Sequence, residues 1–374
     1  MDPKGPIARR FPLVARFRPA CLPLPARVGS LSEFADRAVE QADQGLASTV
    51  FNQAALLASD LGLPELARSM CYRHAAAYLG TCPLPAMSAI RGLEPLVNLA
   101  RLQIRAGAND DGRKRLLDLY EAVGAGNSAV FEGITVPAEL TATADDRREV
   151  RAWLWRVVIA DGTRTLTATG RWAEALAHLE QHKGVGLRML DGRQVAVMTA
   201  LTQGDRDKAV ALLAGTTPGE PWEQEVTDCL GLLAHPDAGR CNDTGATELV
   251  KRYVSREPGP GLTVFDTRLG LTILDTVGPQ SSDARKLVDE LTRRVLDAKH
   301  GYSARDLLSH TLFSTLATPT ESRTCSDLVW LCGLQTGVLP GELADSLSSA
   351  LDRSEVVLIR SNTPERSQSP LPRP

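Results

Sequence analysis

The chain has 374 residues, of which 43% are hydrophobic and 23% are charged, fractions that exclude wholesale disorder and a fibrous fold. The formal net charge of −3 excludes the uniformly basic surface of a general nucleic-acid binder. Only 5% of the residues are aromatic, while Ala, Leu and Arg recur throughout, which favours close-packed helices over sheets. The length allows two or three domains or one long repeat array.

Cysteine usage indicates the compartment. The odd number of cysteines and the lack of a C-x-x-C spacing are typical of a reduced protein rather than a disulfide framework. The N-terminal segment has no apolar run long enough for a secretory signal, and no window approaches the ~18 apolar residues that cross a bilayer. We therefore expect a cytoplasmic protein without a membrane segment. The seven cysteines are Cys21, Cys71, Cys82, Cys229, Cys241, Cys325 and Cys332.

Residues 1–28 are predicted to form an extended, basic arm, because prolines recur along the segment and forbid a continuous helix. The basic side chains could meet phosphates, but Phe11 and Phe17 are the only aromatics available for stacking on bases, and the segment matches no DNA-reading motif. We therefore expect the arm to pack on the first helices and not to bind nucleic acid.

From about Leu31 the apolar residues adopt helical spacing, and helices are predicted to continue to about residue 352. The expected divisions are helical repeats over 29–215, less regular helical repeats over 216–352, and a tail over 353–374. The tail ends in the Pro- and Ser-rich stretch SNTPERSQSPLPRP, which cannot bury enough apolar surface to become ordered.

One spacing recurs along the first repeat region: a Gly followed five positions later by a small residue. We expect each Gly to end a helix in the left-handed conformation and each small residue to let the next helix pack closely against the first. The third and fourth units are 34 residues apart. The pairs are Gly62 with Ala67, Gly107 with Gly112, Gly170 with Ala175, and Gly204 with Ala209.

These units, as in ADGTRTLTATGRWAEALAHLEQH and QVAVMTALTQGDRDKAVALLAG, resemble the tetratricopeptide repeat over about residues 46–215. Looser units follow near Trp222–Val254 and Thr263–Val295. The resemblance implies an all-α, right-handed solenoid of helix-turn-helix repeats behind the N-terminal arm. In such a solenoid the first helix of each pair lines a concave groove.

The repeat frame selects groove-facing positions. In the tetratricopeptide family, Asn and basic side chains at comparable positions clamp peptide carboxylates, and the resemblance implies a similar use here. The alternative is a solvated helix face with ordinary charges. The candidate groove residues are Asn52, Asn98, Arg101, Arg105, Asp161, Arg164, Arg193 and Gln194, of which Asn98, Arg101 and Arg105 form one helical stripe.

Catalytic signals are sparse, because the common phosphate-loop, dinucleotide, nucleophile-elbow and zinc-protease motifs are all missing. Cys71 and His74 share a predicted helix face and form the candidate thiol and base of an enzyme, although Cys71 also occupies a core position of the repeat. His178 and His182 have metal-ligand spacing but lack a third ligand nearby, so no metal or cofactor is expected.

A second resemblance concerns the pathway. Stretches such as FNQAALLASDLGLPELAR and LLAGTTPGEPWEQEV are similar to helical-repeat proteins of peptide natural-product pathways in actinomycetes. The first hypothesis is a scaffold that binds a precursor peptide or a partner enzyme in such a pathway. The alternatives are a stand-alone lanthipeptide-type cyclase that closes thioether rings, and a regulatory repeat protein without a DNA-binding domain.

Overall fold

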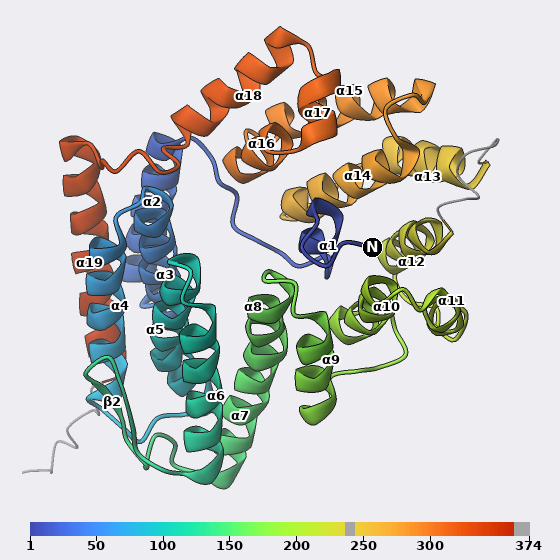
Figure 1. Cartoon of the computed structure of the whole chain (residues 1–374). Coiled ribbons are helices and arrows are strands. Elements are labelled where there is room, and N and C mark those ends of the chain that lie inside the picture. The colour runs from blue at the N-terminus through green and yellow to red at the C-terminus, as the bar shows by residue number, and fades with distance from the viewer. Residues whose placement is uncertain (236–243, 363–374) are drawn as a thin grey trace, which may run out of the picture. The chain divides into compact units, whose positions relative to one another are not determined.

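The computed structural model describes residues 1–235 and 244–362 (Figure 1). Over these residues the chain is helical apart from one short β-hairpin and an isolated bridge between Leu84 and Thr141, which confirms the predicted all-α class. The chain divides into two compact units, each assembled from segments distant in sequence. We call residues 1–26 with 155–336 the arm unit, and residues 27–154 with the segment from 337 onward the hairpin unit. This division replaces the predicted boundary at residue 215.

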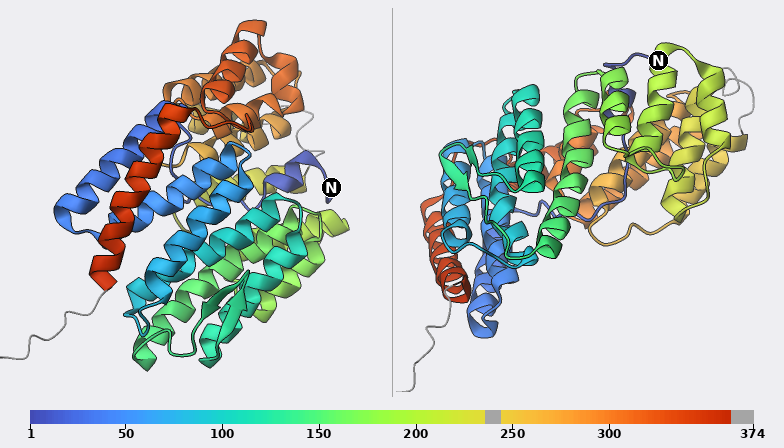
Figure 2. Two further views of the ribbon diagram at one scale, coloured as in Figure 1. Left: turned by 90° about the vertical axis from the view of Figure 1, so that its left-hand side faces the viewer. Right: turned by 90° about the horizontal axis from the view of Figure 1, so that it is seen from below.

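The hairpin unit contains an array of antiparallel neighbours in which α3 packs on α4, α4 on α5 and α5 on α6, and the returning helix α19 packs on α3 and α4 (Figure 2). Its elements are α2 (Leu24–Gln41), α3 (Gln44–Asp60), α4 (Pro64–Leu79), α5 (Ala86–Arg105), α6 (Asn109–Ala125), β1 (Ala129–Phe131), β2 (Ile134–Val136), most of α7 (Ala144–Val157), and α19 (Gly341–Asn362).

The arm unit consists of the N-terminal segment and the helices after α7, among which α8 packs on α9, α10 on α11, α12 on α13 and α14 on α15. Its elements are α1 (Pro6–Arg10), the π-helical turn η1 (Val158–Gly162), α8 (Thr163–Thr167), α9 (Trp172–Gln181), α10 (Asp191–Gln203), α11 (Arg206–Ala214), α12 (Pro221–Ala234), α13 (Thr244–Ser255), α14 (Thr263–Val277), α15 (Ser282–Asp297), α16 (Gly301–Leu308), α17 (Thr311–Leu316) and α18 (Pro319–Leu331).

The recurring Gly spacing forms helix pairs as expected. The four glycines have φ between +77° and +91°, the left-handed region that a Cβ disfavours. The small residue five positions later is buried in every unit. Gly112 shows why it must be small, since a Cβ there would lie 2.5 Å from Ile104 Cγ1 and 2.9 Å from the Ala100 carbonyl oxygen on α5. The backbones of α5 and α6 therefore approach closely at this point.

Two expectations about local structure are wrong, and one element was not predicted. Residues 353–362 are not part of a disordered tail but complete α19, whose apolar spacing continues through the buried Val357 and Leu358; residues 363–374 lie outside the described part of the chain. The arm is not wholly extended, because Pro6 occupies the first turn of α1, where a missing N–H costs nothing, and α2 already begins at Leu24. The β-hairpin at residues 129–136 was not predicted.

Gly112→Ala is expected to reduce the free energy of unfolding by about 1–3 kcal/mol, because the added methyl group has no space between α5 and α6. Gly29→Ala is the matched control in the same unit: Gly29 is helical and a Cβ there would meet no atom within 4 Å. The control should be neutral or stabilising by up to ~1 kcal/mol. Urea unfolding followed by circular dichroism measures both; equal effects would refute the close approach.

Candidate functional site

The N-terminal arm lies among the helices of its own unit, with α1 against α14 (Figure 1). Its backbone is held by groups from several of these helices. The Met1 ammonium donates to the Leu201 carbonyl oxygen at 3.1 Å, and the Trp172 indole N–H donates to the Pro3 carbonyl oxygen at 3.0 Å. Much of this segment is not helical, so its backbone N–H and C=O groups lack the hydrogen bonds that a helix would provide. These contacts provide hydrogen bonds in their place. The prediction that the arm packs on the first helices is therefore wrong.

Gln194 on α10 makes the most specific of these contacts. Its Nε2 donates to the Leu13 carbonyl oxygen at 2.6 Å, and its Oε1 accepts from the Leu13 N–H at 2.6 Å. A further bond from Nε2 to the Met189 carbonyl oxygen, at 3.0 Å, fixes the orientation of the amide. Gln194 is completely buried. One side-chain amide thus satisfies both backbone groups of an extended residue.

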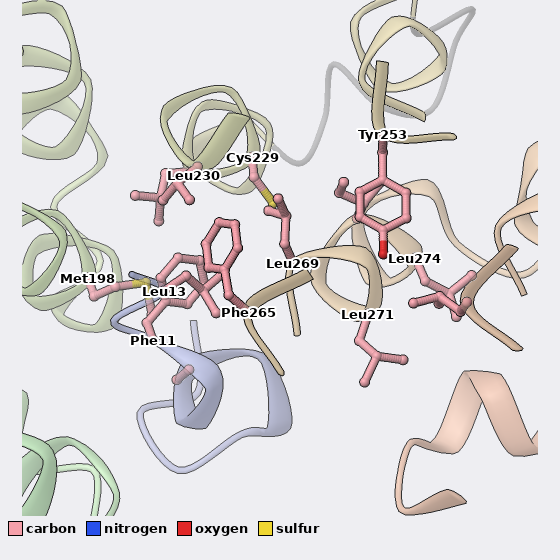
Figure 3. Packing of buried hydrophobic residues seen from close by; sticks show 14 of the residues in the cluster. Phe11, Leu13, Met198, Cys229, Leu230, Tyr253, Phe265, Leu269, Leu271 and Leu274 are labelled. Atoms are coloured by element: carbon pink, nitrogen blue, oxygen red, sulfur yellow. The ribbon is translucent and has the colours of Figure 1, made fainter. Parts of the chain in front are cut away.

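Apolar side chains of the arm belong to the core of the unit. Phe11 and Leu13 are 1% and 2% exposed. Figure 3 shows both rising from the arm towards Met198 of α10 and Phe265 of α14, with Leu230 of α12 nearby. Because these side chains fill the space between the helices, the arm is an integral part of the packing rather than a surface appendage.

Charged pairs fix the arm at its sides. Arg10 forms an ion pair with Asp275, and its Nε donates to Thr272 Oγ1 at 3.0 Å. Burial lowers the pKa of Arg10 to about 10 and the pKa of His310, whose Nε2 lies 3.2 Å from Asp275 Oδ2, to about 4. Arg16 forms an ion pair with Asp191 at the start of α10.

The other groove candidates of this unit have different surroundings. Arg193 donates to the Leu212 carbonyl oxygen at 2.5 Å and to Thr216 Oγ1 at 3.3 Å, so it binds the end of the paired helix α11. Asp161 lies in η1 and Arg164 in α8. Burial, followed by the nearby charges of Arg268 and Arg18, lowers the pKa of Arg164 to about 10. The four candidates do not form an open stripe, and Gln194 is covered by the arm.

The candidates of the hairpin unit do lie together, on α3 and α5. Asn52 Nδ2 donates to Glu94 Oε2 at 2.5 Å, Asn98 Nδ2 donates to Asn52 Oδ1 at 2.9 Å, and an Arg101 N–H donates to Asn98 Oδ1 at 3.1 Å. Burial raises the pKa of Glu94, and the hydrogen bond from Asn52 opposes that shift. We call Asn52, Asn98, Arg101 and Arg105 the α3–α5 stripe.

Arg105 forms the far end of the stripe. Its guanidinium donates to Ser59 Oγ at 2.7 Å and reaches Asp60 Oδ1 at 3.3 Å. Asp60 is buried and also accepts from Arg27 at 2.7 Å. The Arg105 side chain remains 47% exposed, and Arg101 is exposed as well. The stripe therefore has an internally bonded amide centre and two arginines at the surface.

The candidate catalytic pair is enclosed in the core of the hairpin unit. Cys71 and His74 are 2% and 1% exposed, and burial raises the pKa of the Cys71 thiol to about 12. His74 stacks on Phe51 with ring centres 5.2 Å apart, and its Nε2 lies 3.2 Å from Ser48 Oγ, which in turn lies 2.7 Å from the Tyr78 hydroxyl. A protonated, inaccessible thiol beside a neutral imidazole fits packing rather than nucleophilic catalysis.

The predicted histidine pair is also structural in its contacts. His178 is 6% exposed and bonds to the Val158 carbonyl oxygen at 3.2 Å, and its ring centre lies 4.8 Å from that of His182. Trp155 donates to the His182 carbonyl oxygen at 2.8 Å. Within residues 1–235 and 244–362, no three His, Cys, Asp or Glu side chains group in a way that could hold a metal ion, and no helix combines the length and hydropathy needed to cross a bilayer.

Sequence reasoning missed Glu132, at the turn of the β-hairpin. It adopts φ +47°, and its carboxylate, on a side chain that is 10% exposed, accepts from Arg68, Arg115, Gln103 and the Tyr72 hydroxyl. These partners come from α4, α5 and α6, so one carboxylate ties the hairpin to three helices. A signal was present: β-branched residues flank the Glu-Gly dipeptide in AVFEGITV, a pattern typical of a two-residue hairpin turn.

Gln194→Ala is expected to lower the free energy of unfolding by roughly 2–5 kcal/mol, because it leaves the buried N–H and C=O of Leu13 unsatisfied. Gln224→Ala, at an exposed position of α12 where the amide donates to Asp228 on the same helix, should change stability by less than ~0.5 kcal/mol. Urea unfolding measures the cost, and limited proteolysis should show faster cleavage within the arm only for Gln194→Ala. Equal stability of the two variants would contradict this role.

Stability is expected to fall as the solution is acidified. Burial lowers the pKa of His74 to about 3 from 6.5, so below pH 6.5 the unfolded chain binds a proton that the folded chain excludes. The stabilising effect of the neutral ring is complete above pH 6.5 and is lost as the pH falls towards 3, by up to ~1.4 kcal/mol per pH unit. Urea unfolding at several pH values should show a shallower dependence for His74→Gln, whereas His235→Gln, at an exposed site, should match the wild type. An unchanged slope in His74→Gln would refute the assignment.

Comparisons with known proteins give no family, relative or structural neighbour for this chain. Protein-family models, curated proteins and solved structures were each searched, and none matches. The two features that bear on function are therefore those of the chain itself: the arm held by Gln194 in one unit, and the exposed arginines of the α3–α5 stripe in the other.

Proposed function

We propose that this chain is a peptide- or protein-binding scaffold of tetratricopeptide-like helical repeats, with the α3–α5 stripe as its binding face. The observation that carries the proposal is the pair of hydrogen bonds between the Gln194 amide and the backbone of Leu13. It shows that an amide side chain on a helix of this chain binds an extended segment through both backbone groups. The stripe presents the same chemical groups, amides and guanidiniums, on a face where Arg101 and Arg105 are exposed.

The repeat architecture supports the proposal. Four helix pairs share a left-handed Gly and a buried small residue, as expected for stacked helical hairpins. A right-handed solenoid of such pairs would turn successive first helices towards one surface. Asn52 of α3 and Asn98 of α5 both belong to first helices of their pairs, and they are hydrogen-bonded to each other. A ligand that binds the amide of Asn52 would therefore lie close to the amide of Asn98.

The chemistry of the stripe selects the class of ligand. Arg101 and Arg105 are both exposed, and a guanidinium carries five donors in a planar fork. Guanidiniums pair with carboxylates in two-point geometry. We therefore propose an extended peptide with acidic side chains as the partner, either a precursor peptide or a segment of a partner enzyme in a peptide-modifying pathway.

The cyclase alternative has less support than the scaffold. Cys71 and His74 are its candidate catalytic thiol and base, and both are buried in the core of the hairpin unit. A ring-forming enzyme would cause thiol loss from a dehydrated precursor peptide without a change of mass, and Cys71→Ala would abolish that loss. The regulatory alternative predicts a partner that is itself a transcription factor. The identity of neighbouring genes distinguishes the biosynthetic and regulatory alternatives.

Arg101→Ala and Arg105→Ala are each expected to weaken binding of an acidic peptide by about 1–3 kcal/mol, the value of one charge-assisted contact. The probes are fluorescent, unstructured peptides rich in Asp and Glu, compared with the same peptides carrying Asn and Gln, and fluorescence anisotropy measures the affinity. Any short peptides encoded by neighbouring genes form a second set of probes.

Arg148→Ala is the matched control for these variants. Arg148 is an exposed arginine of the same unit, its side chain 76% exposed, and it forms an ion pair with Asp145 on the same helix. This variant should bind the acidic peptides as the wild type does. Equal affinity for acidic and amide peptides, or tight nucleotide binding with no response to any peptide, would contradict the proposed function.

A further inference from the structure

Two cysteine side chains of the arm unit lie beside one glycine. Cys21 is the last buried residue of the arm before α2, Cys332 directly follows α18, and Gly301 is the first residue of α16. The Cys21 carbonyl oxygen accepts from the Gly301 N–H at 2.7 Å and from the Cys332 thiol at 3.2 Å. Three segments far apart in sequence therefore meet at this point.

The glycine leaves room for both sulfur atoms. A Cβ on Gly301 would lie 2.7 Å from Cys332 Sγ and 3.1 Å from Cys21 Sγ. The two sulfurs flank the same empty position, and their separation cannot exceed the sum of these two distances. A disulfide bond requires an S–S distance of about 2.0 Å. Closure therefore needs a movement of a few ångströms, the scale of a rotation about the Cα–Cβ bonds.

We propose that Cys21 and Cys332 are a modification site at which an internal disulfide fastens the end of the arm to the end of α18. The oxidant is a low-molecular-weight disulfide such as oxidised glutathione. One cysteine thiolate attacks it, forming a mixed disulfide and releasing one glutathione thiol; the second cysteine thiolate then displaces the other glutathione. Both cysteines lose a proton and an electron, and the two electrons and two protons end on two glutathione thiols.

The surroundings of the pair allow this chemistry without global unfolding. Cys21 and Cys332 are themselves 1% and 0% exposed, but their chain neighbours Ala20 and Leu331 are exposed. Displacement of the arm end by a residue or two would uncover both thiols, and such local opening costs less than global unfolding. Once formed, the bond would join residues distant in sequence and restrict the unfolded chain, so the oxidised protein should resist unfolding.

The test treats the full-length, folded protein with oxidised glutathione, blocks remaining thiols under denaturing conditions, and locates cross-linked peptides by mass spectrometry. We expect the loss of two thiols per chain, a mass decrease of two hydrogen atoms, and one cross-linked peptide that joins Cys21 to Cys332. The midpoint of urea unfolding should rise on oxidation and return on treatment with dithiothreitol.

Three variants make the result specific. Cys21→Ala and Cys332→Ala should each prevent the cross-link. Cys325→Ala, which removes a buried thiol from helix α18 directly before Cys332, should leave the cross-link intact. If Cys332→Ala folds poorly, Cys21→Ala tests the same cross-link by removing its other thiol. A cross-link between other cysteines, glutathione adducts alone at Cys82, or retention of every thiol would overturn the proposal.

Discussion

The arm unit depends on one constraint: a chain segment without helical hydrogen bonds is buried among helices, and its backbone groups must be satisfied there. Gln194 meets this constraint for Leu13, and the Trp172 indole and the Gly301 N–H meet it for Pro3 and Cys21. The apolar side chains of the arm can then enter the core. Without these polar contacts, the desolvation of the backbone would offset the gain from burying Phe11 and Leu13.

The two units use similar side chains in different ways. In the arm unit, Gln194 and Arg193 are buried and bind backbone groups of the chain itself. In the hairpin unit, Asn52 and Asn98 bond to one another, and arginines remain exposed at the edge. A buried amide with fixed partners contributes mainly to stability, whereas an exposed guanidinium retains donors for a ligand. The physical difference is the arm, which covers Gln194 within its own unit.

The helix pairs were predictable from sequence, because the left-handed Gly and the close-packed small residue are local requirements with a fixed spacing. The α3–α5 stripe followed from the same frame. The path of the arm was not predictable, since Phe11 and Leu13 show no periodicity and are surrounded by arginine and proline. Its true partners are more than a hundred residues away. The burial of Cys71 follows from the core position that it occupies in the repeat.

The end of α19 was missed for a different reason. The Ser- and Pro-rich stretch begins only at Ser361, and the apolar spacing through Val357 and Leu358 continues that of Leu347 and Leu351. A compositional boundary and a structural boundary need not coincide. Here a helix capable of packing on α3 and α4 precedes the biased stretch directly.

The interleaved order of the two units has a consequence for synthesis of the chain. The arm is synthesised well before Gln194 and the helices that enclose Phe11. The hairpin unit in turn lacks α19 until the described chain is nearly complete. Neither unit can finish folding by the usual N-terminal-first route of multidomain proteins. The apolar side chains of the arm must therefore stay exposed during translation until these helices are made. A bulky fusion placed before Met1 would have to be accommodated beside Leu201, because the Met1 ammonium donates to the Leu201 carbonyl oxygen.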